Sequence, residues 1–111
     1  MTLADTSVWV YHFRHGSPAL RRLLEAGEVA THSMVLGELA CGRLHQRTQT
    51  LELLGNLPQI PVAPDEIVME AIEQSRLWSR GVGWIDLHLL TASRISGVSL
   101  WTLDRRLAQL I

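Results

Sequence analysis

The chain has 111 residues, a single cysteine and a formal net charge of −1. This length predicts one domain, residues 1–111, that can bury most of its apolar surface. The near balance of charge excludes a global positive field, and no apolar run reaches the roughly 20 residues that a membrane-spanning helix needs. Met1 is not followed by a basic segment and Cys41 cannot form an internal disulfide, so we expect a cytoplasmic protein without a signal peptide.

The first half of the chain predicts an alternation of short strands and helices. A strand ends at Asp5, and the polar residues after it begin a helix. Gly16 and Gly27 are typical helix ends, and Ser17 and Ser33 are typical N-caps. The expected elements are a strand up to Asp5, helices over 7–14 and 17–26, a strand over 28–32, and helices over 34–44 and 46–55.

The second half continues the same alternation. Pro58 and Pro61 lead into a short edge strand, Val62–Ala63. The remaining elements are a helix over 64–80, a flexible connection over 81–83, a helix over 86–96, a strand over 98–102 and a helix over 105–111. Strands that alternate with helices predict an α/β fold with right-handed crossovers and a parallel sheet covered on both faces.

Four carboxylates are surrounded by apolar residues in the sequence, unlike the other acids. They are Asp5, at the end of the first strand, and Glu38, Asp86 and Asp104, on or beside predicted helices. A carboxylate on an apolar face is costly unless it is paired or coordinated. Ligands of α/β sheets bind outside the carboxyl ends of the strands, so we expect the four acids to gather there around a divalent cation. Such a cation lowers the pKa of a bound water and makes hydroxide available for attack at phosphorus.

Structural roles remain open for these acids. Asp5, Asp86 and Asp104 each lie near the start of a predicted helix and could cap it, whereas Glu38 lies in the middle of a helix and caps nothing. An acidic stripe on the 64–80 helix is expected to be an ordinary solvated face: Glu66, Glu70 and Glu73. The histidines lack the spacing of a metal site; His45 and His88 are expected at the surface or half-buried, and Cys41 in the core.

Four segments in this order resemble the PIN-domain ribonucleases, and in particular the VapC toxins of toxin–antitoxin pairs: LADTSVW, SMVLGELACGR, GWIDLHLLTAS and LWTLDRRL. The resemblance covers nearly the whole chain. It implies a three-layer PIN-like fold with a parallel sheet of four to five short strands flanked by helices. A last strand, common in the family, would follow Ile111.

The resemblance also implies a function. By this resemblance, the protein is expected to be a metal-dependent endoribonuclease. Its catalytic acids, which would also bind Mg²⁺ or Mn²⁺, are Asp5, Glu38, Asp86 and Asp104. Small hydroxyl residues, Thr6 and Thr102, match positions that support the site. Toxins of this type are typically homodimers inhibited by a small antitoxin that inserts a basic residue toward the acids. Arg43 and Arg105, near the mouth of the site, are expected to hold RNA phosphates. His32, which ends a predicted strand on the same edge as Asp5, is expected to contact the substrate.

A catalytically inactive PIN-like module that only binds a protein partner is the alternative interpretation. Tryptophan is enriched at interface hot spots, and the chain has four: Trp9, Trp78, Trp84 and Trp101. We expect at most two of them at interfaces. Binding of Mn²⁺ separates the two interpretations.

Overall fold

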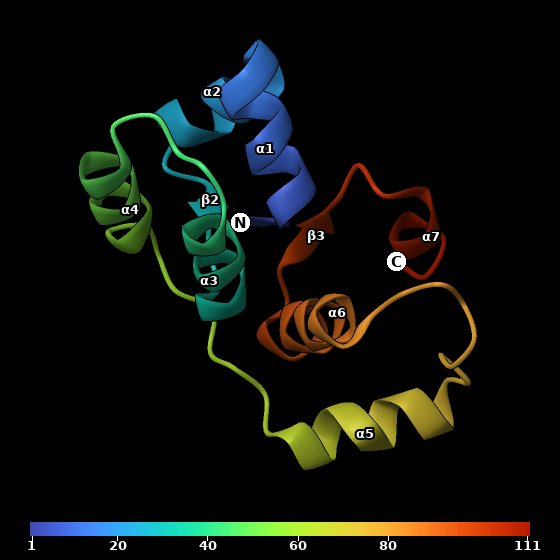
Figure 1. Cartoon of the computed structure of the whole chain (residues 1–111). Coiled ribbons are helices and arrows are strands. Elements are labelled where there is room, and N and C mark those ends of the chain that lie inside the picture. Colours follow the sequence, from blue (N-terminus) through green and yellow to red (C-terminus); the bar gives the residue numbers. More distant parts are fainter.

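The computed structural model describes residues 1–111 and contains three short strands and seven helices (Figure 1). The strands are β1 Thr2–Ala4, β2 Val29–Ala30 and β3 Ser99–Trp101. The helices are α1 Thr6–His15, α2 Pro18–Glu25, α3 Ser33–Cys41, α4 Arg47–Gly55, α5 Asp65–Gln74, α6 Trp84–Ser96 and α7 Arg105–Ala108.

The sheet has the strand order β2-β1-β3, and both pairings are parallel, as the alternation of elements predicts. The first strand is therefore the central one, and Ala4 pairs with Trp101 at its carboxyl end. A fourth segment touches the sheet only through an isolated bridge between Thr31 and Gln59. The edge strand predicted at Val62–Ala63 is therefore wrong in position: the chain pairs between Pro58 and Pro61, then turns away toward α5.

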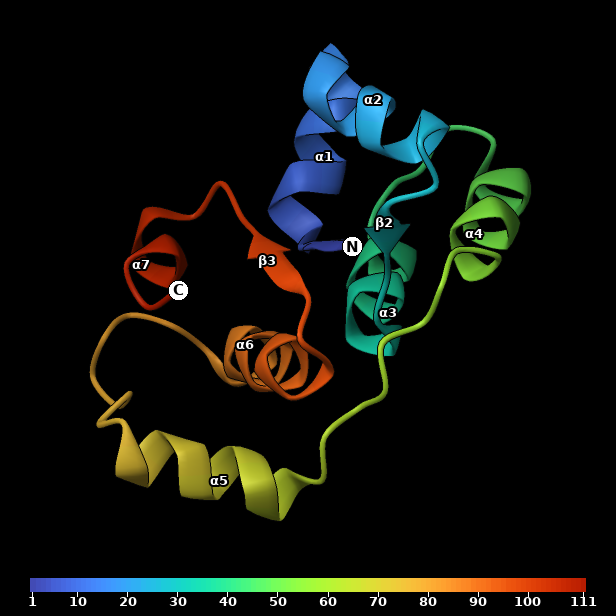
Figure 2. The ribbon, with the colours of Figure 1, turned by 180° about the vertical axis from the view of Figure 1, so that it is seen from behind.

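Helices cover both faces of this sheet. Figure 1 shows α1 and α2 on one side of the strands and α6 on the other, with α5 packed outside α6; Figure 2 shows the same order from behind. Leu3 and Ala4 are consecutive residues of β1 and both are fully buried. Because consecutive strand residues point to opposite faces, the central strand has a core on each side. No helix is long and apolar enough to cross a membrane.

The connection from α5 to α6 differs from the prediction. The helix expected over 64–80 ends at Gln74, and the following turns place Arg76 and Ser79 at φ 53° and 57°. Gly81 has φ 74°, and a Cβ there would lie 2.6 Å from Cδ of Arg106. The side chain of Arg106 thus lies against this loop and ties α7 to the segment that precedes α6.

Candidate active site

Asp5 lies at the carboxyl end of the central strand and is 3% exposed. Its side chain caps α1, because Oδ1 accepts a hydrogen bond from the backbone N–H of Val8 at 3.2 Å. Its backbone N–H donates to the carbonyl of Trp101 at 3.0 Å, so the neighbouring strand also fixes it. Asp5 is therefore the N-cap of α1, and it also lies at the carboxyl end of the central strand, where the functional interpretation expects a carboxylate.

Two hydroxyl groups hold the Asp5 carboxylate from both sides. Ser7 Oγ donates to Oδ1 and Thr102 Oγ1 donates to Oδ2, each at 2.5 Å. The same hydroxyls are fixed in turn, because Ser7 accepts from the backbone N–H of Leu103 and Thr102 accepts from that of Asp104, both at 3.0 Å. Thr102 was expected beside the acids. Ser7 was not singled out as a site residue, although it is the second hydroxyl after Asp5 in the sequence.

Glu38 lies on α3, across from the start of α1. Its Oε1 accepts a hydrogen bond of 2.6 Å from the hydroxyl of Thr6, the residue that follows Asp5. The side chain of Glu38 is exposed, so the apolar surroundings expected from the sequence are not found. The hydrogen bond nevertheless places this carboxylate beside the start of α1.

Asp104 is the N-cap of α7. Its Oδ1 accepts from the backbone N–H groups of Arg106 at 2.8 Å and Leu107 at 3.1 Å. The residue is exposed, which again differs from the apolar setting expected. The open choice between a cap and a site residue is thus answered in part: Asp104 does cap a helix, and it also lies two residues after Thr102, which holds Asp5.

Asp86 lies inside the first turn of α6, whose N-cap is Gly83, so Asp86 is not a cap. Partial burial raises the pKa of this carboxyl above its ordinary value, and the charges of Asp5, Glu38 and Asp104 raise it further. The other three acids singled out in the sequence therefore all lie within electrostatic reach of Asp86. The only contact between a basic and an acidic side chain at ion-pair distance joins His88 Nε2 to Asp65, so no arginine pairs with any of the four acids.

The four carboxylates do not form a ready-made cage. No three acidic, histidine or cysteine side chains are grouped closely enough to hold one metal ion. Each of the three outer acids comes from a different element, and Glu38 and Asp104 are held by hydrogen bonds of their own. We call these four acids, at the carboxyl end of the sheet, the acidic edge: Asp5, Glu38, Asp86 and Asp104. The carboxylate of Asp5 is its rigid centre.

Asp86→Asn is expected to stabilise the metal-free protein. The pKa of Asp86 is raised in the folded state, so the fold favours the protonated form of this carboxyl. The stabilisation that the protonated carboxyl contributes is fully present below its ordinary pKa of 3.8, and it is lost as the pH rises through the native pKa. Removing the charge should raise Tm by a few degrees at neutral pH in a chelating buffer. The gain should vanish in acid.

Thermal unfolding of the wild type and the variant across pH measures this difference. Glu66→Gln, in the exposed first turn of α5, is the matched control and should leave Tm nearly unchanged. An Asp86→Asn protein that is no more stable than the wild type at neutral pH would show that the four charges do not repel one another.

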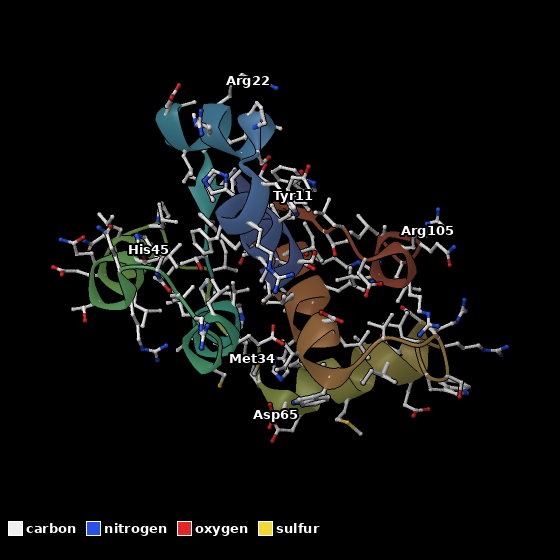
Figure 3. The ribbon with its side chains drawn as sticks, turned by 45° about the horizontal axis from the view of Figure 1, so that its top comes forward. Tyr11, Arg22, Met34, His45, Asp65 and Arg105 are labelled. Atoms are coloured by element: carbon white, nitrogen blue, oxygen red, sulfur yellow. The ribbon has the colours of Figure 1, made fainter.

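The three residues expected to contact the substrate differ in their exposure to solvent. Arg43 is exposed and lines a hollow of about 150 Å³ together with Glu38, Thr6 and Arg14, the last of which was not predicted. Arg105 is exposed at the start of α7, directly after Asp104 (Figure 3). His32 is fully buried, so its expected contact with a substrate is wrong. Its Nδ1 accepts from the backbone N–H of Met34 and caps α3, in place of Ser33.

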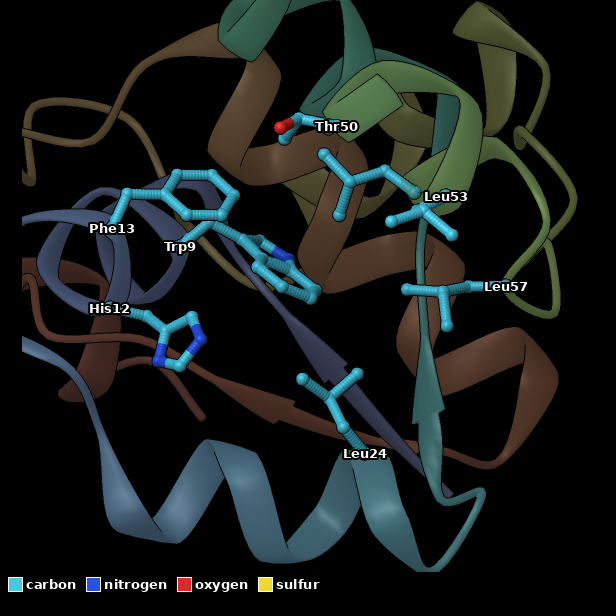
Figure 4. A pocket seen from close by; sticks show the side chains of 8 residues that line it. Trp9, His12, Phe13, Leu24, Thr50, Leu53 and Leu57 are labelled. Carbon is cyan, nitrogen blue, oxygen red and sulfur yellow. The ribbon is translucent and has the colours of Figure 1, made fainter. Parts of the chain in front are cut away.

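An apolar groove of about 330 Å³ lies between α1, α2 and α4 (Figure 4). Its lining includes Trp9, Phe13, Leu24, Leu53 and Leu57. Leu53 is 68% exposed and Phe13 44% exposed, so the groove presents apolar surface to solvent. Phe13 also lines the hollow beside Glu38, so this hollow and the groove are neighbours.

Two other residues correct expectations from the sequence. His88 is fully buried rather than at the surface, and Cys41 is exposed rather than in the core. Two tryptophans are exposed, Trp78 at 51% and Trp84 at 39%, which fits the expectation that at most two are available to a partner.

Comparison with known proteins gives a consistent family assignment. The PIN domain family model matches residues 2–110. The protein named Ribonuclease VapC32 from Mycobacterium tuberculosis, in strains CDC 1551 / Oshkosh and ATCC 25618 / H37Rv, is 43% identical over 108 residues. That match spans 96% of this chain and 87% of the relative.

Two crystal structures share the fold at low sequence identity. PAE2754 from Pyrobaculum aerophilum superposes with a TM-score of 0.68 at 19% identity, over 96% of this chain and 81% of that one. VapC20 from Mycobacterium tuberculosis, described as a sarcin–ricin loop cleaving toxin, superposes with a TM-score of 0.64 at 18% identity, over 99% and 95%.

Proposed function

Because the chain belongs to the PIN-domain family, we propose that it is a ribonuclease and the toxin of a VapBC-like toxin–antitoxin pair. The reaction is hydrolysis of RNA phosphodiester bonds by a metal-dependent endoribonuclease. The single observation that carries this proposal is the hydrogen-bond network in which Thr6 and Thr102 link Asp5, Glu38 and Asp104 at the carboxyl end of the sheet. No arginine pairs with any of these acids.

The donor set fits Mg²⁺ or Mn²⁺. These hard cations take oxygen ligands, and Mg²⁺ keeps several waters while binding only one or two protein carboxylates together with substrate phosphate. A site in which no three acids are clustered is compatible with that requirement. Carboxylates without a positive partner repel one another, so binding of a cation between them stabilises the folded protein.

The residues of the chain have separable roles in this proposal. A bound cation would supply an acidic water and positive charge for the transition state. Asp5 is the fixed ligand, because Ser7, Thr102 and the amide of Val8 hold its carboxylate in place. Asp86, whose pKa is raised by burial and by the other three acids, and Asp104 would be further ligands of that cation.

Glu38, in the middle of α3, would orient the attacking water or add a ligand to the cation, and Thr6 holds its carboxylate. Arg14 and Arg43 line the hollow next to Glu38, where their guanidinium groups can contact RNA phosphates in a bidentate manner. Arg105, exposed beside Asp104, is available on the other side of the acids.

The antitoxin is proposed to occupy the apolar groove of Figure 4 with an amphipathic helix. The groove and the hollow lined by Glu38 lie on either side of Phe13, which lines both. A bound segment with apolar residues followed by a basic residue would therefore fill the groove and bring its charge to the acids. We also propose a homodimer, as the resemblance to VapC toxins implies.

Incubation of the purified protein with a defined single-stranded RNA tests the function. We expect cleavage with Mg²⁺ or Mn²⁺ and none with EDTA. Because water rather than the RNA 2′-hydroxyl attacks phosphorus, the products should lack 2′,3′-cyclic phosphates. Cleavage that survives EDTA would argue against the metal mechanism, and absence of cleavage on RNAs of varied sequence and structure would favour the inactive binding module.

A further inference from the structure

A second hollow, of about 420 Å³, lies beside the one that Glu38 lines, between the end of α1 and the loop from α3 to α4. We call it the outer hollow. The two hollows are neighbours because four residues line both of them: Phe13, Arg14, Arg43 and Leu44. The rest of the outer hollow is polar and is lined by His45, Gln46 and Thr50. A substrate held at Glu38 therefore has a second recess next to it.

The loop between α3 and α4 has a fixed backbone. The guanidinium of Arg47 donates to the carbonyl oxygen of Gly42 at 3.2 Å and to a second carbonyl at the end of α3 at 2.6 Å. The hydroxyl of Thr50 donates to the carbonyl of His45, and its backbone N–H donates to the carbonyl of Gln46, both at 3.0 Å. These contacts hold both ends of the loop, in which His45 is labelled in Figure 3. The wall that the loop forms is therefore preformed.

The side chains that this loop contributes to the outer hollow have no partner in the protein. Arg43, His45 and Gln46 are exposed, and none of them makes a side-chain hydrogen bond or an ion pair. Arg14, which lines the same hollow from α1, also has no acidic partner. Polar groups on a rigid backbone can bind a ligand with little loss of conformational freedom. This lining is therefore suited to recognition.

Gln46 has a backbone conformation that its residue type disfavours. Its φ of 48° and ψ of 54° lie in the left-handed region, which glycine adopts freely and a residue with a Cβ does not. Glycine would serve the turn better, so the strain points to a use for the side chain. The amide of Gln46 offers a donor and an acceptor side by side, and such a pair matches the edge of a nucleobase.

Phe13 provides a flat apolar surface at the same hollow. Its ring is 44% exposed, and Trp9 supports it from the side of the core, with ring centroids 5.8 Å apart. Every nucleobase has a π face that can stack on such a ring. Two unpaired arginines beside the ring attract a phosphate, whereas an acidic peptide would bind the arginines and make no use of the ring. The lining therefore favours a nucleotide over a peptide.

We propose that the outer hollow binds one unpaired nucleotide of the RNA, next to the bond that is cleaved. This inference rests on the proposed function. The base stacks on Phe13 and its edge bonds to the amide of Gln46. Arg14 and Arg43, which line both hollows, contact the phosphate that connects this nucleotide to the acidic edge. The volume of about 420 Å³ is within the usual range of ligand pockets, and Gln46 becomes a specificity-determining residue.

Fluorescence anisotropy with end-labelled single-stranded RNA tests the stacking in EDTA, where no cleavage is expected. Phe13→Leu keeps an apolar side chain but removes the ring, and it should raise Kd about tenfold. Phe13→Tyr keeps the ring and should bind RNA as tightly as the wild type does. Equal Kd values for the wild type and Phe13→Leu would overturn the proposal.

The same assay tests the phosphate contact. Arg43→Gln should weaken binding of all sequences alike and reduce the slope of log K against log salt by about 0.7, the value for one phosphate of a single strand. Arg22→Gln is the matched control, since Arg22 is exposed on α2 and lines neither hollow (Figure 3). It should leave Kd and the slope nearly unchanged. Equal losses in both variants would show a general effect of charge and no nucleotide site.

Gln46→Gly separates recognition from folding. Glycine adopts a φ of 48° without strain, so Tm should stay the same or rise. In Mg²⁺-dependent cleavage of a randomised RNA pool, the wild type should prefer one base at a position next to the cleaved bond, and Gln46→Gly should lose this preference. Ser79→Gly is the matched control, because Ser79 also has a positive φ, 57°, in the loop before α6. It should keep the preference.

The outcomes distinguish this site from the nuclease itself. Cleavage without a base preference in the wild type, or with an unchanged preference in Gln46→Gly, would overturn the nucleotide site and leave the proposed function in place. A wild type that binds RNA through Phe13 but does not cleave it would refute the proposed function and leave the nucleotide site in place.

Discussion

Asp5→Asn is expected to abolish Mg²⁺-dependent cleavage of RNA while the protein stays folded. The charge at the only fully buried acid of the site is lost, and with it several kcal/mol of electrostatic stabilisation, so the rate should fall about a thousandfold or more. The amide oxygen of asparagine can still accept from the Val8 N–H that begins α1, so the fold should survive. Cleavage rates and circular dichroism of the same preparation measure both effects.

The control for this variant is Glu73→Gln, on the exposed acidic stripe of α5. It removes an identical charge far from the sheet edge and should cleave RNA at the wild-type rate. Full activity in Asp5→Asn would remove this carboxylate from the mechanism. Loss of the circular dichroism signal would instead show that its capping role dominates.

Addition of Mg²⁺ or Mn²⁺ is expected to raise Tm strongly. A ligand that binds only the folded state stabilises it by about 2.7 kcal/mol at a concentration 100 times its Kd, which for a domain of this size corresponds to roughly 10 °C. The acidic edge should respond in this way because the cation removes the repulsion that raises the pKa of Asp86. Calorimetric unfolding with increasing metal concentration gives the effect without any RNA.

The response should be lost in Asp5→Asn and retained in Glu66→Gln. Equal shifts in both variants would mean that the cation binds elsewhere on the surface. No shift in the wild type would favour the interpretation of the chain as a binding module without a metal.

Local patterns predicted the parts of the site that lie close together in the sequence. The apolar run before Asp5 and the polar residues after it are enough to place a carboxylate at the end of a strand. The same reasoning located Asp104 at the end of β3 and at the start of α7, and left its capping role open. Alternation of elements predicted the parallel sheet.

Contacts between distant segments could not be predicted in the same way. The role of Ser7 depends on Thr102, 95 residues later, and the burial of His88 depends on Asp65, on a different helix. His32 caps α3 because its strand runs directly into the helix, and a search for serine and threonine caps finds Ser33 instead. The exposure of Glu38 and Asp104 likewise follows from tertiary packing, which helix periodicity does not describe.

The hydrogen bond from Thr102 to Asp5 closes a loop of 97 residues, and β3, the last strand made, pairs with β1, the first. During synthesis the N-terminal part of the chain leaves the ribosome long before β3 does. Until then Asp5 lacks its hydroxyl partner, and Asp104 has not joined the acidic edge. The candidate site is therefore completed only when β3 joins β1, which makes it one of the late events of folding.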